Sequence, residues 1–199
     1  MKRSAIAVCL AAMAFLASCA HTPSALDLND LGNRYYHAGQ YEKALGNYHH
    51  ALDLAAKSGD AQYEAIAMFG MARANAQLCH PSEAEKWFTR SIEARRKLPN
   101  LNEAYLTQNL LEYGRFLRSQ SRRSEAVAMF DQAMPMLQKL NIELRDPKGY
   151  ALVLKEYEKL LQSAGRENEA KSIAEKASVL ESQYHGIDPK FIPEGYPKC

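Results

Sequence analysis

A recurring order of small and aromatic residues constrains this 199-residue chain more than any other feature. Ala44 is followed four positions later by Tyr48 and, after three more, by Ala51. The same order starts again at Ala84, Ala126 and Ala170, so by subtraction the anchoring alanines lie 40, 42 and 44 residues apart. Residues three or four positions apart share one helical face, and a period of this length is that of a helical hairpin. The pattern predicts an all-α chain of repeated hairpins.

The first unit resembles a tetratricopeptide repeat. In that family small residues let two helices approach closely, and aromatic residues fill the space between them. The resemblance implies a solenoid of about four tetratricopeptide-like hairpins over residues 25–184, with a long period of about 42 residues. The positions that match the family pattern are Leu31, Gly32, Tyr35, Ala44, Tyr48 and Ala51.

The fourth unit departs from the pattern. Glu158 stands where the other units have glycine, and Ala174 replaces the aromatic residue. A terminal repeat tolerates a charged residue at such a position, so we expect this unit to cap the solenoid. Two local features concern the second and third units: Ser82 with Glu85 fits a capping box, and Pro135 is expected to kink its helix.

The N-terminus has the layout of a secretory signal. A basic start, Met1-Lys2-Arg3, precedes an apolar run from Ala5 to Ala17 that is too short for a permanent membrane span. The run ends in Leu16-Ala17-Ser18-Cys19, which resembles the bacterial lipobox. That resemblance implies a signal peptide over 1–18 and a lipidated tether over 19–24, with the lipid on Cys19. Ala20, in place of Asp, implies the outer membrane. An ordinary secretory signal with a chance cysteine is the alternative.

Charge and motifs exclude other classes. The formal charge is +2, and without Lys2 and Arg3 the chain has 23 basic and 23 acidic side chains, so bulk charge does not support nucleic-acid binding. No hydrolase, phosphate-loop or Cys-x-x-Cys motif is present. His49 and His50 are adjacent and point about 100° apart on a helix, which disfavours a shared metal. We therefore expect no enzyme, no metal and no cofactor apart from the lipid.

A binding groove remains as the functional candidate. In tetratricopeptide arrays the first helix of each pair lines the concave face, where extended peptides or helices bind. Amides in the N-terminal half and cations in the C-terminal half suit an acidic peptide or a C-terminal carboxylate. Alternatively, these residues are solvated positions without a ligand. Aligning the repeats places the following residues on this face: Asn29, Asn33, Tyr36, Asn75, Arg115, Arg118, Lys155 and Lys159.

These observations predict a membrane-anchored adaptor that faces the periplasm and binds a periplasmic or outer-membrane protein. Envelope, secretion and pilus assembly all remain open as its setting. A self-associating structural lipoprotein is the alternative, and an undetected hydrolase or metal protein is the least favoured one. Replacing Arg115 and Lys159 with Glu is expected to abolish partner capture and to leave thermal stability nearly unchanged.

The last segment, residues 185–199, has three prolines and should be extended. It carries Phe191, Ile192 and Tyr196, which a fully free tail would have little reason to keep, so we expect it to pack against the solenoid. Its fifteen or so residues can span roughly 50 Å, so an internal disulfide between Cys79 and Cys199 is sterically allowed in an oxidising compartment. We favour the other arrangement, with a free Cys79 and a Cys199 open to intermolecular pairing.

Overall fold

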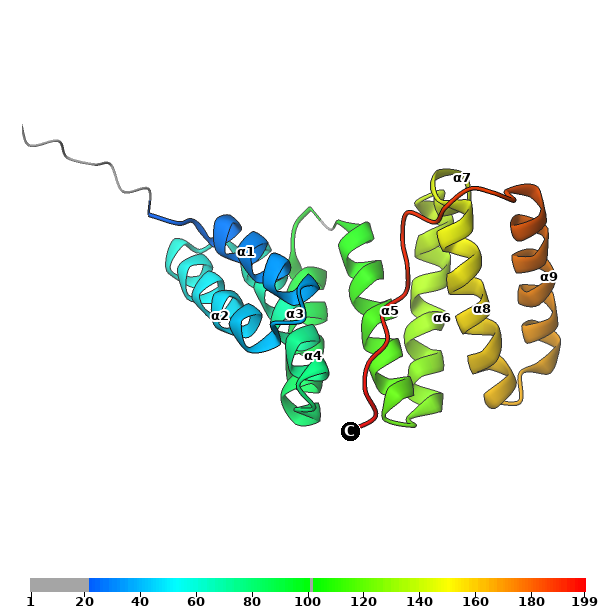
Figure 1. Ribbon diagram of the computed structural model, residues 1–199, viewed down its shortest axis with the longest axis horizontal. Coiled ribbons are helices and arrows are strands. Elements are labelled where there is room, and N and C mark those ends of the chain that lie inside the picture. The colour runs from blue at the N-terminus through cyan, green and yellow to red at the C-terminus, as the bar shows by residue number, and fades with distance from the viewer. Residues whose placement is uncertain (1–21, 101) are drawn as a thin grey trace, which may run out of the picture.

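The computed structural model describes residues 22–100 and 102–199 (Figure 1). The expected signal peptide, residues 1–18, and Cys19 lie outside this range, so both the signal peptide and the lipidation site stay predictions. The described part is helical and contains no strand. Its helices are α1 (Ala25–His37), α2 (Tyr41–Ser58), α3 (Ala61–Gln77), α4 (Pro81–Lys97), α5 (Glu103–Ser119), α6 (Arg123–Lys139), α7 (Ile142–Arg145), α8 (Pro147–Ser163) and α9 (Glu167–Gln183).

The helices pair in chain order into four antiparallel hairpins, and these stack side by side into an open solenoid (Figure 1). The hairpins are α1 with α2, α3 with α4, α5 with α6, and α8 with α9, while the single turn of α7 lies in the last connection. The predicted all-α solenoid is therefore confirmed. None of the helices in the described ranges is long and apolar enough to cross a bilayer.

Close helix packing explains the recurring glycine and aromatic positions. A Cβ atom added to Gly32 or to Gly70 would lie 2.5 Å from the ring of Tyr48, closer than real atoms approach. Tyr48 therefore fills the space between α1 and α3, and a larger residue at either glycine would displace it. Gly114 faces Phe130 in the same way, with an added Cβ 2.8 Å from the ring.

The last hairpin has no such close contact. Half-buried Glu158 stands in place of the glycine, and its carboxylate accepts a hydrogen bond from Gln162 Nε2 at 3.1 Å. The final helix, α9, buries only Ala170, Ala177 and Leu180. A mainly solvated outer helix is what a terminal repeat requires, because no further hairpin packs against it.

Two local expectations have different outcomes. The capping box at Ser82 is wrong, because α4 begins at Pro81 with His80 as its N-cap and without a side-chain cap. Proline at the first helical position fixes the start one residue earlier. Glu85 instead accepts hydrogen bonds from Arg122 at 2.6 and 2.8 Å. Helix α6 continues through Pro135, and the kink expected there stays a prediction.

Candidate functional site

The C-terminal tail, residues 185–199, lies along the concave face of the solenoid. It leaves the end of α9, passes α7 and the start of α8, and then follows α5 (Figure 1). Along this path its residues contact the first helix, or a helix cap, of all four hairpins. We call the surface that the tail contacts the covered band; it includes Tyr36, Gln77, Glu112, Gln120 and Asp146.

The tail first meets the N-cap of α8. Both carboxylate oxygens of Asp146 accept backbone hydrogen bonds, from Lys190 N at 3.1 Å and from Phe191 N at 3.0 Å. Asp146 Oδ1 also caps α8 by accepting from Gly149 N at 3.0 Å. One side chain therefore fixes both the start of a helix and the entry of the tail.

Further along, Glu194 is the acidic anchor of the tail. Tyr36 donates its hydroxyl hydrogen to Glu194 at 2.6 Å, and Arg73 Nη1 lies 3.8 Å from the same carboxylate. Burial raises the pKa of Tyr36 above its ordinary value, which keeps this hydroxyl a donor. Next to it, Gln77 Nε2 donates to the backbone carbonyl of Gly195 at 3.0 Å.

Tyr196 carries the deepest contact of the tail. Its hydroxyl donates to Glu112 at 2.7 Å, and its ring meets Phe88 and Phe116 edge-on. Burial raises the pKa of Tyr196 well above its usual range and also raises the pKa of the Glu112 carboxyl. The neutral phenol thus supplies a donor to a carboxylate that is only 1% exposed.

The tail ends in a covalent bond. Cys199 forms a disulfide with Cys79, the residue between α3 and α4, across a sequence separation of 120 residues. This differs from the arrangement that the sequence favoured, in which Cys79 was free and Cys199 open to another chain. The packing of the tail brings the two cysteines together, and sequence spacing alone does not show it.

Arg115 is a structural residue in this fold. Its guanidinium donates to Glu112 at 2.6 Å and to Glu156 at 2.7 and 2.9 Å, and the Phe191 ring lies 5.1 Å away. At 1% exposure it cannot meet a partner while the tail is in place. The structure therefore contradicts the expectation that Arg115 is an open ligand group. The expected stability of the variant with Glu at positions 115 and 159 stays a prediction, and the buried ion pairs of Arg115 argue against it.

The other predicted cations do not form one basic surface. Arg118 pairs with Glu156 at 3.0 Å, so it joins the Arg115 cluster. Lys155 points toward α9 and pairs with Glu181 at 2.6 Å. Lys159 is exposed, without an ion pair to any described residue. The predicted C-terminal basic patch is thus largely neutralised by carboxylates that the repeat alignment did not place.

The predicted amides have separate roles. Asn33 accepts from the Tyr48 hydroxyl at 2.8 Å, and Asn75 donates to Met71 O at 2.9 Å and faces His80 Nδ1 at 3.3 Å. These two therefore tie side chains within the first two hairpins. Asn29 differs: it is 1% exposed, and neither its amide nitrogen nor its amide oxygen has a hydrogen-bond partner.

Asn29 lines a cavity of about 300 Å³ on the part of the concave face that the tail leaves uncovered. Two cationic side chains share this cavity, Arg73 from α3 and Arg95 from α4. Arg73 is 7% exposed, and its Nε and Nη2 atoms lack hydrogen-bond partners. We call the surface that lines this cavity, including Asn29, Arg73 and Arg95, the open band. Its remaining lining residues include Asp30, Asn33, His37, Tyr63, Tyr105 and Gln108.

Arg95 has no carboxylate partner among the described residues, although it is only 2% exposed. Its guanidinium lies 4.8 Å from the ring of Tyr105, and Asn109, with its amide oxygen turned toward α4, accepts from Arg95 Nε at 3.1 Å. Burial lowers the pKa of Arg95 to about 10, because Tyr105 offsets only part of the lost hydration and no carboxylate pairs with Arg95 in the described part of the chain. A buried cation of this kind attracts an anion.

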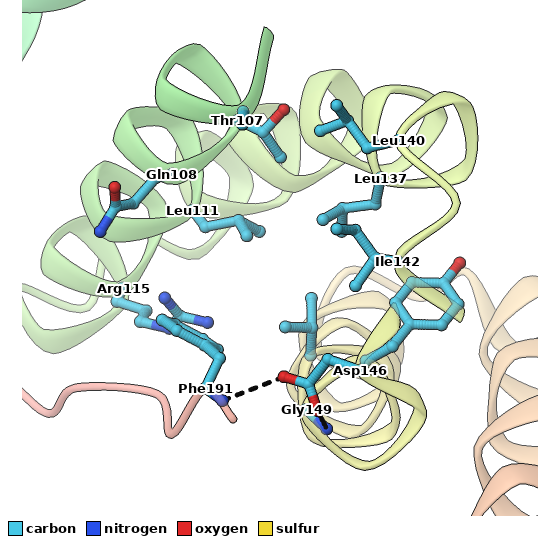
Figure 2. Close-up of a pocket in the computed structure, with 13 residues that line it drawn as sticks. Thr107, Gln108, Leu111, Arg115, Leu137, Leu140, Ile142, Asp146, Gly149 and Phe191 are labelled. Atoms are coloured by element: carbon cyan, nitrogen blue, oxygen red, sulfur yellow. Dashed lines mark hydrogen bonds between the residues drawn. The ribbon is translucent and has the colours of Figure 1, made fainter. Parts of the chain in front are cut away.

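An apolar cavity of about 250 Å³ adjoins the open band at Gln108, which lines both (Figure 2). It lies between α5, α6 and α8, where Leu111 and Leu137 face one another (Figure 2). The Phe191 ring and Arg115 close one end. A cavity that contains two buried arginines therefore adjoins an apolar cavity.

Sequence reasoning missed Arg73, Arg95 and Glu112. The repeat alignment treats second helices such as α4 as scaffold, so Arg95 was not considered. The polar residues Arg73 and Glu112 interrupt apolar runs of α3 and α5, which is the signal that could have drawn attention to them. Among the described residues no cluster of three His, Cys, Asp or Glu side chains could hold a metal ion.

Comparisons with known proteins agree with this architecture. Residues 23–97 match the tetratricopeptide repeat family. Proteins of this class are generally non-enzymatic interaction scaffolds, and no catalytic family is indicated. No curated protein sequence matches the chain significantly.

Solved structures show the same fold at low sequence identity. The crystal structure of BtubC (BKLC) from P. vanneervenii has a TM-score of 0.72 and 20% identity, with 86% of this chain and 68% of that chain covered. A putative kinesin light chain with nearly identical TPR-like repeats from Podosopora anserina has a TM-score of 0.58 and 16% identity, with 82% and 77% covered.

Proposed function

We propose that this protein is a lipid-anchored interaction scaffold that holds an acidic segment of a partner protein in the open band. The observation that carries this proposal is the cavity in which Arg95 is buried without a carboxylate and Asn29 lacks hydrogen-bond partners. Charge-assisted hydrogen bonds to a guanidinium are stronger than neutral ones, so an incoming carboxylate would gain most at this point.

The geometry also suggests the neighbouring residue of the ligand. A carboxylate between Arg73 and Arg95 would place the next part of the chain near Gln108, where the apolar cavity begins. A side chain such as Leu or Phe would bury apolar area there, at about 25 cal/mol for each Å². The preferred segment therefore combines an acidic group, or a C-terminal carboxylate, with a large apolar residue.

Anchoring rests on the N-terminal sequence. Cys19 precedes the first residue of α1, Ala25, by six positions, a tether of at most about 20 Å. Lipid on Cys19 would keep the solenoid close to the outer membrane on its periplasmic side, with the lipid as its only cofactor. A Cys19→Ala variant that fractionates normally with the membrane would contradict this part of the proposal.

Synthetic peptides test the binding site. A fluorescein-labelled decapeptide with Glu beside Leu is compared with the same peptide carrying Gln, and binding to the full-length protein in detergent is followed by anisotropy. We expect the Glu peptide to bind at least tenfold more tightly, and Arg95→Met to remove that preference. Arg96→Met is the matched control, because Arg96 is an exposed neighbour on α4 that bonds to Gln132. Equal binding of both peptides would overturn the proposal.

A further inference from the structure

The tail sits on the covered band in the way that a separate extended peptide binds a groove. Three of its side chains, Phe191, Glu194 and Tyr196, contact different parts of the face. The groove also donates hydrogen bonds to backbone carbonyls of the tail. Gln77 donates to Gly195 O at 3.0 Å, and Gln120 donates to Pro197 O at 3.3 Å. Side-chain subsites combined with backbone hydrogen bonds are the features by which a protein recognises a peptide supplied by another molecule.

The covered band needs an occupant of defined chemistry. Without the tail, buried Glu112 would lose the donor hydroxyl of Tyr196, and Arg73 would lose its nearest carboxylate, Glu194. Glu112 would keep its ion pair with Arg115, but Arg73 would have no ion pair left to any described residue, and leaving a charged group without a partner is costly. The apolar cavity would also lose its wall at Phe191. A replacement segment would therefore have to carry an aromatic residue, an acid three positions later and a tyrosine two positions after that.

The disulfide decides how easily the tail can be replaced. With Cys79 and Cys199 bonded, the tail is held at both ends, by α9 and by the loop between α3 and α4. A doubly attached segment has a very high effective concentration, and a competitor from solution cannot displace it. With the disulfide reduced, only the α9 end remains attached, and the far end is free to leave the groove.

We propose that the covered band is a second peptide-binding surface, whose internal occupant is the tail and whose external ligand is a partner segment with the order aromatic-x-x-acid-x-Tyr. Replacement of the tail by the partner segment requires a dithiol reductant that opens the disulfide between Cys79 and Cys199. That dithiol supplies two electrons and two protons, becomes a disulfide itself, and leaves Cys79 and Cys199 as free thiols. This surface is separate from the site in the open band that we propose for an acidic ligand, although Arg73 borders both.

The probe for this surface is the tail sequence itself. A fluorescein-labelled synthetic peptide of Ile187 to Lys198 is titrated into full-length protein in detergent, in the oxidised form and as a Cys79→Ser/Cys199→Ser variant. We expect at least tenfold tighter binding to the disulfide-free variant. A control peptide with Glu194→Gln and Tyr196→Phe should lose at least tenfold of that binding, because it lacks the acid and the hydroxyl donor.

A second variant keeps the test decisive if the protein's own tail still competes without its disulfide. Adding Glu194→Gln and Tyr196→Phe to the disulfide-free chain weakens the internal occupant and leaves the groove residues intact. The unmodified peptide should then bind more tightly still. In parallel, trypsin should cut after Lys198 faster once the disulfide is absent, since the Cys199 end of the tail is no longer fixed.

Three results would overturn the proposal. Equal peptide binding to the oxidised and disulfide-free chains would show that the disulfide does not control access. No binding to any variant would show that the covered band is only a structural contact. A disulfide-free protein that elutes as a dimer and binds no peptide would make a second copy the occupant. The decapeptide assay with Arg95→Met tests the open band separately, so failure of one proposal is distinguishable from failure of the other.

Discussion

The covered band and the open band lie side by side on one concave face, but the buried arginines in the two bands have different partners. In the covered band Arg115 is surrounded by Glu112 and Glu156, and the tail closes over it. In the open band Arg95 contacts the ring of Tyr105 and the amide oxygen of Asn109, and it has no carboxylate partner among the described residues. Both side chains are at most 2% exposed.

This difference separates a structural charge from a binding charge. A buried cation whose carboxylates come from the same chain is satisfied by folding, and removing it leaves those carboxylates unpaired. The desolvation free energy of a buried cation without a carboxylate is not offset within the protein. A ligand that carries a carboxylate can offset it. The same residue type therefore predicts opposite responses to substitution in the two bands.

The largest effect is expected for Arg115→Ala. The change leaves Glu112 and Glu156 without their guanidinium, so we expect a loss of about 3–5 kcal/mol in the free energy of unfolding. Thermal and urea unfolding measure it. A variant as stable as the wild type would show that the covered band does not depend on this cluster.

Reduction of the disulfide between Cys79 and Cys199 should have the next largest effect. The bond closes a loop across a sequence separation of 120 residues, and opening such a loop is expected to cost about 2–4 kcal/mol. Urea unfolding with and without dithiothreitol gives the difference. The Cys79→Ser/Cys199→Ser variant serves as the control, because reductant should not change its stability.

Arg95→Met should act in the opposite direction. Removing a desolvated cation that lacks a carboxylate is expected to leave stability unchanged or to raise it by about 1 kcal/mol. Comparison with Arg115→Ala in the same unfolding assay sharpens the contrast between the bands. A loss above about 2 kcal/mol would place Arg95 with the structural charges.

The smallest effect is expected for Lys159→Gln. Lys159 is exposed on α8 and forms no ion pair with the part of the chain that the structure describes. Substitutions of this kind change stability by less than about 0.5 kcal/mol. Binding of the acidic decapeptide should also be unchanged, since Lys159 does not line the open band. Weaker binding of the decapeptide to the Lys159→Gln variant would show that the binding site extends beyond the two cavities.

The sequence predicted the fold well because the repeat is a local pattern. Small and aromatic residues at fixed spacing determine how two neighbouring helices pack, and contacts between Tyr48 and two glycines show this directly. The departure at Glu158 likewise marked the hairpin with the exposed last helix. These features depend on residues close together in the chain, which is why periodicity reveals them.

The site was predicted only in part. Asn29, which the alignment assigned to the groove, lines a cavity, but its binding role stays a prediction. The alignment treated Arg115 and Arg118 as open cations, because it could not show that Glu112 and Glu156 lie against them. It also left Arg95 among the scaffold residues of a second helix. Which charges are paired depends on contacts between hairpins.

The amino-acid sequence by itself determined the helical hairpins, their period and the extended character of residues 185–199. Only the tertiary structure decided that this segment lies along the concave face and that Cys199 meets Cys79. The physical reason is distance along the chain: Tyr36 and Glu194 are 158 residues apart, and no local pattern encodes their hydrogen bond. That contact exists because the solenoid brings the first helices of all its hairpins onto one face.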